Sequence, residues 1–184
     1  MKLCFVRHGT TGLVEQRQKA EDILSEEGEI QIRKLAQRVD LYKHSIATLT
    51  SSSLTRAYAS AEIFAETLGL SGLHTANDAL REFSLWVDPQ DLHTEEIHAK
   101  SLGLLRAAQN EFMDFVGTLS HEKDDVHFLI THGNLIRAAI GSLIKTNLET
   151  IVRLSVSNAS LSVVEYDGEK DYYKLILFND TSHL

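Results

Sequence analysis

The sequence has little cysteine, little proline and no long hydrophobic run. Its 184 residues include one cysteine and one proline. Because Cys4 has no second cysteine to pair with, no internal disulfide can form, and we expect a reduced, cytoplasmic setting. No stretch approaches the roughly 20 apolar residues that a membrane-spanning helix needs. We therefore expect no membrane partner.

Positive charge is also scarce. The chain has 18 lysines and arginines against 26 aspartates and glutamates, which gives a formal net charge of -8. This balance argues against a broad basic surface for nucleic acid or for an anionic membrane. A small anionic substrate is still compatible, because a cleft can be positive on an acidic protein. The expected partner is therefore a small molecule and not a nucleic acid.

Common cofactor and metal motifs are missing as well. The sequence contains no Gly-x-Gly-x-x-Gly, no Gly-Lys-Ser/Thr phosphate loop and no Gly-x-Ser-x-Gly nucleophile elbow. Its nine histidines are scattered, and no histidine/carboxylate spacing matches a known metal site. The sequence therefore predicts no cofactor and no metal.

What is present is a regular alternation of apolar strands and amphipathic helices. Strands are expected at 3–6, 46–50, 126–130, 161–166 and 172–178. Helices are expected at 25–41, 54–68, 102–119 and 133–144. The stretch 71–100 has little periodicity and is interpreted as a cap insertion. With no linker or repeat in 1–184, the order predicts one α/β domain, a three-layer sandwich with a mostly parallel central sheet.

Three polar clusters directly follow expected strands. They are Arg7-His8-Gly9, Ser51 to Arg56, and Thr131-His132-Gly133. In open α/β sheets, ligands bind at the carboxyl ends of the strands. We therefore expect these clusters, which are far apart in sequence, to occupy equivalent places at one edge of the sheet.

The residue types in these clusters suit phosphoryl chemistry. Neutral imidazole is a good nucleophile near pH 7, and Gly9 allows the close backbone approach that holds the ring of His8 in one tautomer. Guanidinium groups such as Arg7 and Arg56 bind phosphate oxygens with planar, bidentate geometry. A carboxylic acid such as Glu82 can protonate a leaving oxygen. Taken singly, each residue has an ordinary structural alternative, so the combination carries the argument.

The same residues resemble a known family. Arg7-His8-Gly9 after a first strand is similar to the signature of the histidine phosphatase superfamily, the phosphoglycerate-mutase-like group. Four further segments match that family in the same order. They are Leu24-Ser25-Glu26-Glu27-Gly28 with Gln31, Ser51-Ser52-Ser53-Leu54-Thr55-Arg56-Ala57 with Ser60-Ala61, Leu80-Arg81-Glu82, and Thr131-His132-Gly133 with Ile136-Arg137. The match covers nearly the whole chain, and the tail at 179–184 is similar to the end of members that resemble alpha-ribazole phosphatase.

The resemblance implies a role for each matching position. His8 would be the phosphorylated nucleophile, Glu82 the general acid, and His132 a further catalytic group. The residues that would bind phosphate are Arg7, Arg56, His8, His132 and Gly133. The arginines and His132 would supply the positive charge that other enzymes take from a metal ion.

Three departures from the family pattern bear on function. Phosphatase members often carry Gly-x-Trp-Glu-Gly shortly after the acid, whereas this chain has Phe83-Ser84-Leu85-Trp86-Val87, which argues against Glu82 as the acid. Many relatives have an asparagine that contacts phosphate at the position of Val14. The mutases continue from their acid as Glu-Arg-His-Tyr-Gly, whereas this chain has Glu82-Phe83-Ser84, which argues against mutase activity. The predicted function is therefore a phosphomonoesterase with a phosphohistidine intermediate. A phosphoglycerate-mutase-type transfer and a non-catalytic phospho-ligand binder are the alternatives.

The stretch after Glu82 suggests the substrate. It holds few basic residues, so a second phosphate group would find no cluster of cations there. Phe83, Leu85 and Trp86 are expected to offer apolar surface for an organic leaving group. The expected substrates are small organic monophosphates.

Overall fold

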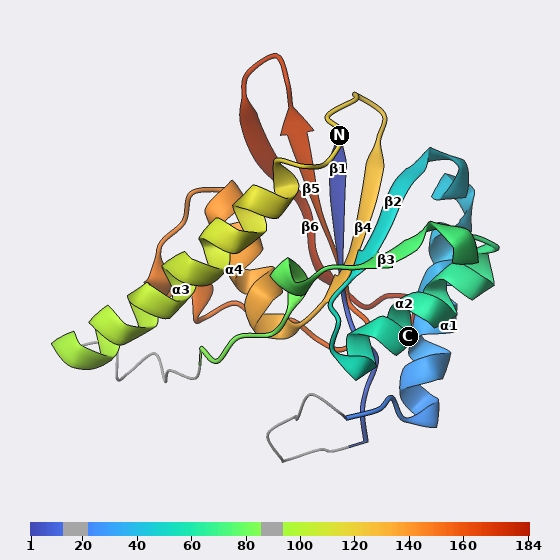
Figure 1. The fold of residues 1–184 in the computed structure, drawn as a ribbon, viewed down its shortest axis with the longest axis horizontal. Helices are drawn as coiled ribbons and strands as arrows, with labels where there is room; N and C mark the ends of the chain where they lie inside the picture. Colours follow the sequence, from blue (N-terminus) through green and yellow to red (C-terminus); the bar gives the residue numbers. More distant parts are fainter. Residues whose placement is uncertain (13–21, 86–93) are drawn as a thin grey trace.

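The computed structural model describes residues 1–12, 22–85 and 94–184. Within them lies one six-stranded sheet with the strand order β3-β2-β4-β1-β5-β6 (Figure 1). The strands are β1 (Lys2–Arg7), β2 (Ile46–Ser51), β3 (His74–Ala76), β4 (Val126–Thr131), β5 (Leu161–Asp167) and β6 (Tyr172–Asp180). The α/β class and the mostly parallel sheet that the sequence predicted are confirmed.

Neighbouring strands on one half of the sheet run parallel. β1 pairs with β4, β4 with β2, and β2 with β3, all in parallel, while β5 and β6 form an antiparallel hairpin beside β1. All six residues of β4 are buried, as are Leu3–Val6 of β1. A strand covered on both faces needs mostly apolar side chains without alternation, which is the pattern of Leu3–Val6 and of Phe128–Ile130, while the buried His127 is hydrogen-bonded to Thr48 and Ser120.

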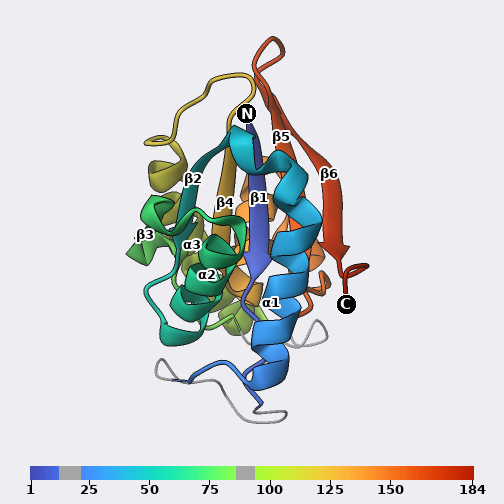
Figure 2. The same cartoon turned by 90° about the vertical axis from the view of Figure 1, so that its right-hand side faces the viewer.

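Helices cover both faces of the sheet. The longer helices are α1 (Glu26–Val39), α2 (Thr55–Leu68), α3 (Glu95–Val116) and α4 (Gly133–Leu143), and short turns of helix are η1 (Asp40–Ser45), η2 (Ser71–Leu73), η3 (Asp78–Leu80) and α5 (Leu148–Ile151). Figures 1 and 2 show α1 and α2 on one face and α3 and α4 on the other. The three-layer sandwich is therefore present in the described residues.

The core has one main layer on each side of the sheet. On one side, Phe64 of α2 lies with its ring centroid 5.0 Å from that of Phe128 in β4. On the other, Phe112 of α3 lies 5.7 Å from Phe5 in β1. All four rings are buried, and truncating one to alanine is expected to cost about 3–5 kcal/mol. These layers hold the sheet rigid beneath its polar edge.

The ends of α1 and α2 follow the sequence signals. The hydroxyl of Ser25 accepts a hydrogen bond from the backbone N–H of Gly28 at 3.1 Å and so caps α1. Gly69, with φ 71°, adopts the left-handed conformation that ends α2. Both helix boundaries agree with the expectation within two residues.

The expected cap at 71–100 differs from what the structure shows. His74–Ala76 is a strand of the main sheet, paired in parallel with β2, and the side chain of Leu80 is fully buried in the core. α3 begins at Glu95 and not at Leu102. Residues 86–93 lie outside the described residues. A three-residue strand is too short to show periodicity, which is why its place in the sheet was missed.

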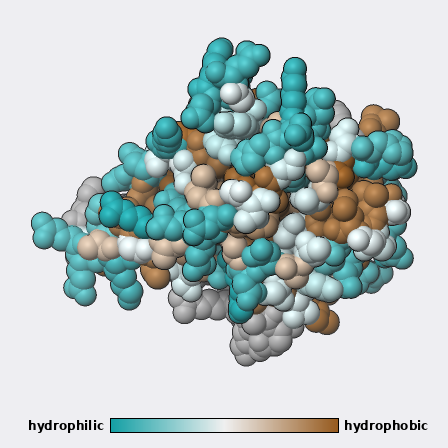
Figure 3. Space-filling view, turned by 45° about the horizontal axis from the view of Figure 1, so that its top comes forward, coloured by the Kyte–Doolittle hydropathy of each residue, from teal (hydrophilic) through white to brown (hydrophobic). Residues whose placement is uncertain are grey.

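The face in Figure 3 is largely hydrophilic, with hydrophobic patches spread between the polar side chains and the largest of them at the right. Among the described residues, no helix combines the length and the hydropathy that crossing a bilayer requires.

Candidate active site

The site lies where three neighbouring parallel strands end. His8 follows β1, His132 follows β4, and Ser52 follows β2. The register pairs Arg7 with Thr131, so the two histidines leave the sheet at the same level. Their rings are buried, with centroids 5.2 Å apart and planes at 59°. The sequence prediction that these clusters meet at one edge is therefore met in the structure.

Two hydrogen bonds define the ring of His8. Its Nδ1 lies 2.8 Å from the carbonyl oxygen of Gly9. Because a carbonyl oxygen only accepts, Nδ1 carries the proton and Nε2 keeps its lone pair. The Nε–H of Arg56 donates to that lone pair at 3.1 Å. The atom free to act as a nucleophile is thus Nε2, and it faces a guanidinium group.

The surroundings keep His8 neutral. Burial lowers the pKa of His8 to about 3, and the charges of Arg7 and Arg56 act in the same direction. The hydrogen bond to Gly9 opposes this shift without cancelling it. An imidazole in this state is unprotonated at any pH above about 4, as a nucleophile must be.

His132 has one ring nitrogen paired with Ser52 and one without a partner in the described residues. Its Nε2 lies 2.8 Å from the hydroxyl of Ser52, which itself accepts the backbone N–H of Leu54 at 3.2 Å. This arrangement favours a hydroxyl that donates to Nε2, and so a proton on Nδ1. That Nδ1 is buried and has no hydrogen-bond partner among the described residues. Burial, followed by the nearby His8, lowers the pKa of His132 well below its usual value.

Two arginines border the histidines. Arg7 donates from Nη1 to the carbonyl of Val156 at 2.6 Å, while its buried Nε has no partner within the described chain. A Cβ added at Gly133 would lie 3.6 Å from that Nε, so the guanidinium packs against the start of α4. Burial lowers the pKa of Arg56, and the charges of Glu82 and Asp22 partly compensate. Two cations and the first N–H groups of a helix therefore surround His8 and His132.

Glu82 approaches from the segment after η3. Its carboxylate accepts backbone N–H groups from Phe83 at 3.2 Å and, more weakly, from Asn134 at 3.5 Å. Burial raises its pKa, although these bonds and the charges of Arg56 and Arg7 act against the rise. A carboxyl group with a raised pKa beside two arginines is suited to donate a proton.

Comparison with known proteins agrees with this geometry. The model of the histidine phosphatase superfamily (branch 1) matches residues 3–118 and 106–181. The chain belongs to the histidine phosphatase superfamily. No curated protein sequence is significantly similar to it.

Solved structures of histidine phosphatases and related enzymes have the same fold. A mycobacterial glucosyl-3-phosphoglycerate phosphatase in complex with VO3 is 25% identical, with 97% of this chain and 98% of that chain covered and a TM-score of 0.75. Phosphoserine phosphatase from Entamoeba histolytica in complex with 3-phosphoglyceric acid is 18% identical (100% and 98% covered, TM-score 0.77). Phosphoglycerate mutase from Bacillus anthracis is 19% identical (99% and 94% covered, TM-score 0.74). The superfamily match and the phosphatase at 25% identity support phosphatase activity, whereas the two less similar structures show the fold alone.

The family motif at 24–31 supports the histidine phosphatase site from behind the loop that follows His8. The side-chain oxygen of Gln31 accepts from both the N–H and the hydroxyl of Thr10, at 3.1 and 3.0 Å. The hydroxyl of Ser25 donates to the Thr10 carbonyl at 2.9 Å. A Cβ at Gly9 would lie 2.3 Å from the carbonyl oxygen of Gly28. The loop after His8 is therefore fixed directly onto the N-terminus of α1.

Sequence reasoning missed the contacts that two residues make in the site. Ser52 orients His132, and Asn158 donates from its amide to the backbone oxygens of His8 and Gly9 at 3.1 and 3.3 Å. Ser52 belongs to the polar cluster expected after the second strand and to a family motif, but neither signal predicted its bond to His132. Asn158 lies in a loop with no motif, so nothing in the sequence signalled its contact.

One expectation about the leaving-group side is wrong. Leu85 was expected to offer apolar surface near the acid, but it is buried among Leu105, Ala138 and Ile151. Phe83 packs against the same cluster. Leu85 faces the core because its side chain packs in the cluster that Leu105 of α3 and Ala138 of α4 form with α5. Trp86 and the Val14 position lie outside the described residues.

The described ranges hold no group of three or more histidine, cysteine, aspartate or glutamate side chains placed to share a metal ion. The cations that the described part of the site does show are its arginines.

Proposed function

We propose that this histidine phosphatase is a phosphomonoesterase that transfers a phosphoryl group from small organic monophosphates to Nε2 of His8 and then to water. The observation that carries the proposal is the state of His8. Its ring is buried and neutral, Nδ1 donates a hydrogen bond to the Gly9 carbonyl, and Nε2 keeps a lone pair that faces Arg56. Such a group is a nucleophile held in one tautomer.

The first step is an in-line attack on phosphorus. Nε2 of His8 forms the P–N bond as the P–O bond to the leaving group breaks. The Nε–H of Arg56, which donates to Nε2 in the structure, turns to a phosphoryl oxygen. Arg7 and the Nδ1–H of His132 donate to the remaining oxygens, with the N–H of Gly133 at the start of α4.

Glu82 acts on the leaving group. Its proton passes to the departing alkoxide, which would otherwise leave as a strong base. The resulting carboxylate then accepts a proton from the water that attacks the phosphohistidine. The raised pKa of Glu82 fits the acid role, and the nearby arginines stabilise the carboxylate between the two steps.

Monophosphates are the proposed substrates because the described rim of the site carries few cations. Arg81 is exposed and paired with Asp78 at 3.9 Å, so its charge is already partly balanced. A bisphosphate would need a denser cluster to hold its distal group. We expect a higher kcat/KM for an aryl or nucleoside monophosphate than for a bisphosphorylated sugar or glycerate.

The decisive test is trapping of the intermediate. Brief mixing with labelled p-nitrophenyl phosphate and quenching should leave label on the wild type and none on His8→Ala. A phosphohistidine P–N bond is labile in acid and survives alkali, whereas a phosphoserine ester behaves in the opposite way. Label with phosphoserine stability, or His8→Ala activity within tenfold of wild type, would rule the mechanism out.

A further inference from the structure

Arg137 lies one turn beyond the start of α4 and makes two contacts. Its Nη2 donates to the side-chain oxygen of Asn134, and its Nη1 donates to the carbonyl of Val152 at 3.4 Å. Val152 follows α5, so the guanidinium joins α4 to the loop behind it. The residue is partly buried and was singled out in the sequence only as the end of a family motif.

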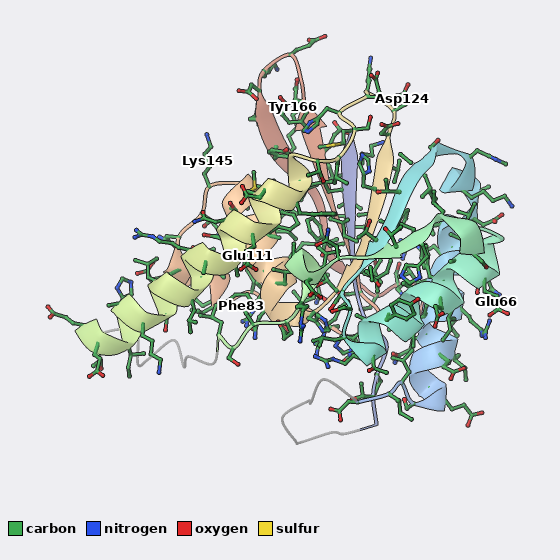
Figure 4. The ribbon with its side chains drawn as sticks, viewed as in Figure 1. Glu66, Phe83, Glu111, Asp124, Lys145 and Tyr166 are labelled. Carbon is green, nitrogen blue, oxygen red and sulfur yellow. The ribbon has the colours of Figure 1, made fainter. Side chains whose placement is uncertain are left out.

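The contact with Arg137 decides how the amide of Asn134 is oriented. A guanidinium only donates, so the atom of Asn134 that faces it must be the carbonyl oxygen. The amide nitrogen therefore points the other way, where it donates to the carbonyl of Phe83 at 2.9 Å. The partners of Asn134 on both sides thus require the same orientation. Figure 4 shows Phe83 beside the start of α4.

Asn134 holds the Glu82–Phe83 segment at two points. Besides the bond to Phe83, its backbone N–H donates to the carboxylate of Glu82 at 3.5 Å. On the other side, the hydroxyl of Thr131 donates to the carbonyl of Leu80 at 2.6 Å. Glu82 lies in neither a helix nor a strand, so these few bonds fix its carboxyl group relative to His8.

Arg137 is also electrostatically close to this carboxylate. Burial lowers the pKa of Arg137, and the charge of Glu82 is the main influence in the opposite direction. The cations that chiefly lower the pKa of Glu82 are Arg56 and Arg7, and the N–H of Asn134, which bonds the carboxylate, lowers it too. Loss of Arg137 should loosen that N–H bond and so raise the pKa of Glu82.

We propose that Arg137 is a positioning residue which, through the amide of Asn134, holds Glu82 in place to protonate the leaving group. The inference rests on the proposed function, in which Glu82 is the general acid. The alternative is that Arg137 only ties α4 to the loop at Val152 and contributes to stability alone.

The kinetic test compares two leaving groups. p-Nitrophenolate departs without a proton, whereas the alkoxide of β-glycerol phosphate needs one. Arg137→Met should lower kcat/KM for β-glycerol phosphate by about tenfold or more and for p-nitrophenyl phosphate by less than about threefold. Arg137→Met/Asn134→Ala should be no slower than Asn134→Ala, because the two residues act through one path. Equal losses on both substrates, or additive losses, would overturn the positioning role.

Arg153→Met is the matched control. Arg153 is exposed in the same loop and donates to a backbone carbonyl, that of Glu149, without contact to Glu82. It should leave both rates unchanged. Arg137→Lys, which keeps the charge, should recover part of the loss on β-glycerol phosphate.

A measurement without turnover separates this inference from the proposed function. NMR titration of the Glu82 carboxyl carbon should show a higher pKa in Arg137→Met than in wild type, with no change in Arg153→Met. An unchanged Glu82 titration would overturn the inference even in an active enzyme. By contrast, equal slowing of both substrates in Glu82→Gln would show that Glu82 is not the general acid, which contradicts the proposed function. In that case the titration would still show whether Arg137 positions the Glu82 carboxyl group.

Discussion

The Nε–H of Arg56 lies 3.1 Å from Nε2 of His8 and donates to it. The guanidinium group that would stabilise a phosphoryl oxygen is therefore hydrogen-bonded to the nucleophilic nitrogen before substrate binds. Both residues are almost completely buried, so their relative position is set by β1 and α2 and not by solvent. Substrate must displace this one bond, which is replaced at once by a charge-assisted bond to phosphate.

The first prediction concerns that guanidinium. Arg56→Lys keeps the charge but loses the planar fork and the Nε–H, so kcat/KM for p-nitrophenyl phosphate should fall by about 10²–10³-fold. Arg33→Lys, which alters an exposed arginine paired with Glu66 on the surface, is the control and should change nothing. A loss of less than threefold in Arg56→Lys would show that a point charge suffices.

The second prediction concerns the general acid. Glu82→Gln should slow β-glycerol phosphate about 10²-fold or more and p-nitrophenyl phosphate far less, because only the alkoxide needs a proton. The measurement is kcat/KM for both esters in both proteins. If both fall equally, Glu82 is not the acid. The other candidates are Glu95 and Glu96, together with Asp88 and Asp91, which lie outside the described residues.

The third prediction concerns acid stability. The folded pKa values of His8 and His132 lie below the ordinary 6.5, so the unfolded chain binds more protons as pH falls through 6.5. Their contribution to stability is complete above about pH 6.5 and is lost progressively toward pH 3. Glu82, with a raised pKa, acts in the opposite sense but is a single group.

Urea unfolding of the wild type at pH 7 and pH 5 measures this effect, and the midpoint should fall at the lower pH. His8→Gln cannot take up the extra proton, so its midpoint should change less between the two pH values. A midpoint in the wild type that is independent of pH would mean that the histidines are not held neutral in the fold.

The fourth prediction concerns metal. Because the charge at the described part of the site comes from arginines, activity should survive dialysis against EDTA. Loss of activity on chelation, with recovery on adding a divalent cation, would contradict this.

The fifth prediction concerns Gly28 in α1. An alanine in a helix is usually about 1 kcal/mol more stable than a glycine, but a Cβ at Gly28 would lie 2.1 Å from the carbonyl oxygen of Thr10. Gly28→Ala should therefore lower Tm and displace the loop after His8. Gly103→Ala in α3, where nothing lies within 4 Å, should raise Tm instead. If both substitutions raise Tm, the loop can move away at little cost.

Much of the fold could be predicted because its strongest signals are local. The apolar runs Leu3–Val6 of β1 and Phe128–Ile130 of β4, the cap at Ser25 and the stop at Gly69 each follow from a few neighbouring residues. β3 could not be found in this way, since three residues carry no period and their pairing with β2 is a tertiary contact. The same holds for Leu85, whose burial depends on helices far away in sequence.

In the site, too, some residues could be predicted from local sequence, whereas others depend on tertiary contacts. His8 and His132 were predictable because parallel strands end at one edge of a sheet. The hydrogen bonds that orient them were not, because Ser52 and Asn158 act from other loops. The sequence therefore indicates the reacting groups well, but it does not indicate the groups that orient them.

The order of the strands has a consequence for synthesis of the chain. Within the described residues, β1 pairs with β4 and β5 alone, and the first residues of these strands are Val126 and Leu161. More than a hundred residues must therefore be added before Leu3–Val6 finds its first partner strand, and contacts over such separations form slowly. During that interval the apolar segment around Cys4 depends on chaperones or on the growing helices for cover. Its thiol should thus be open to alkylation in nascent chains and protected in the finished protein, where it is buried.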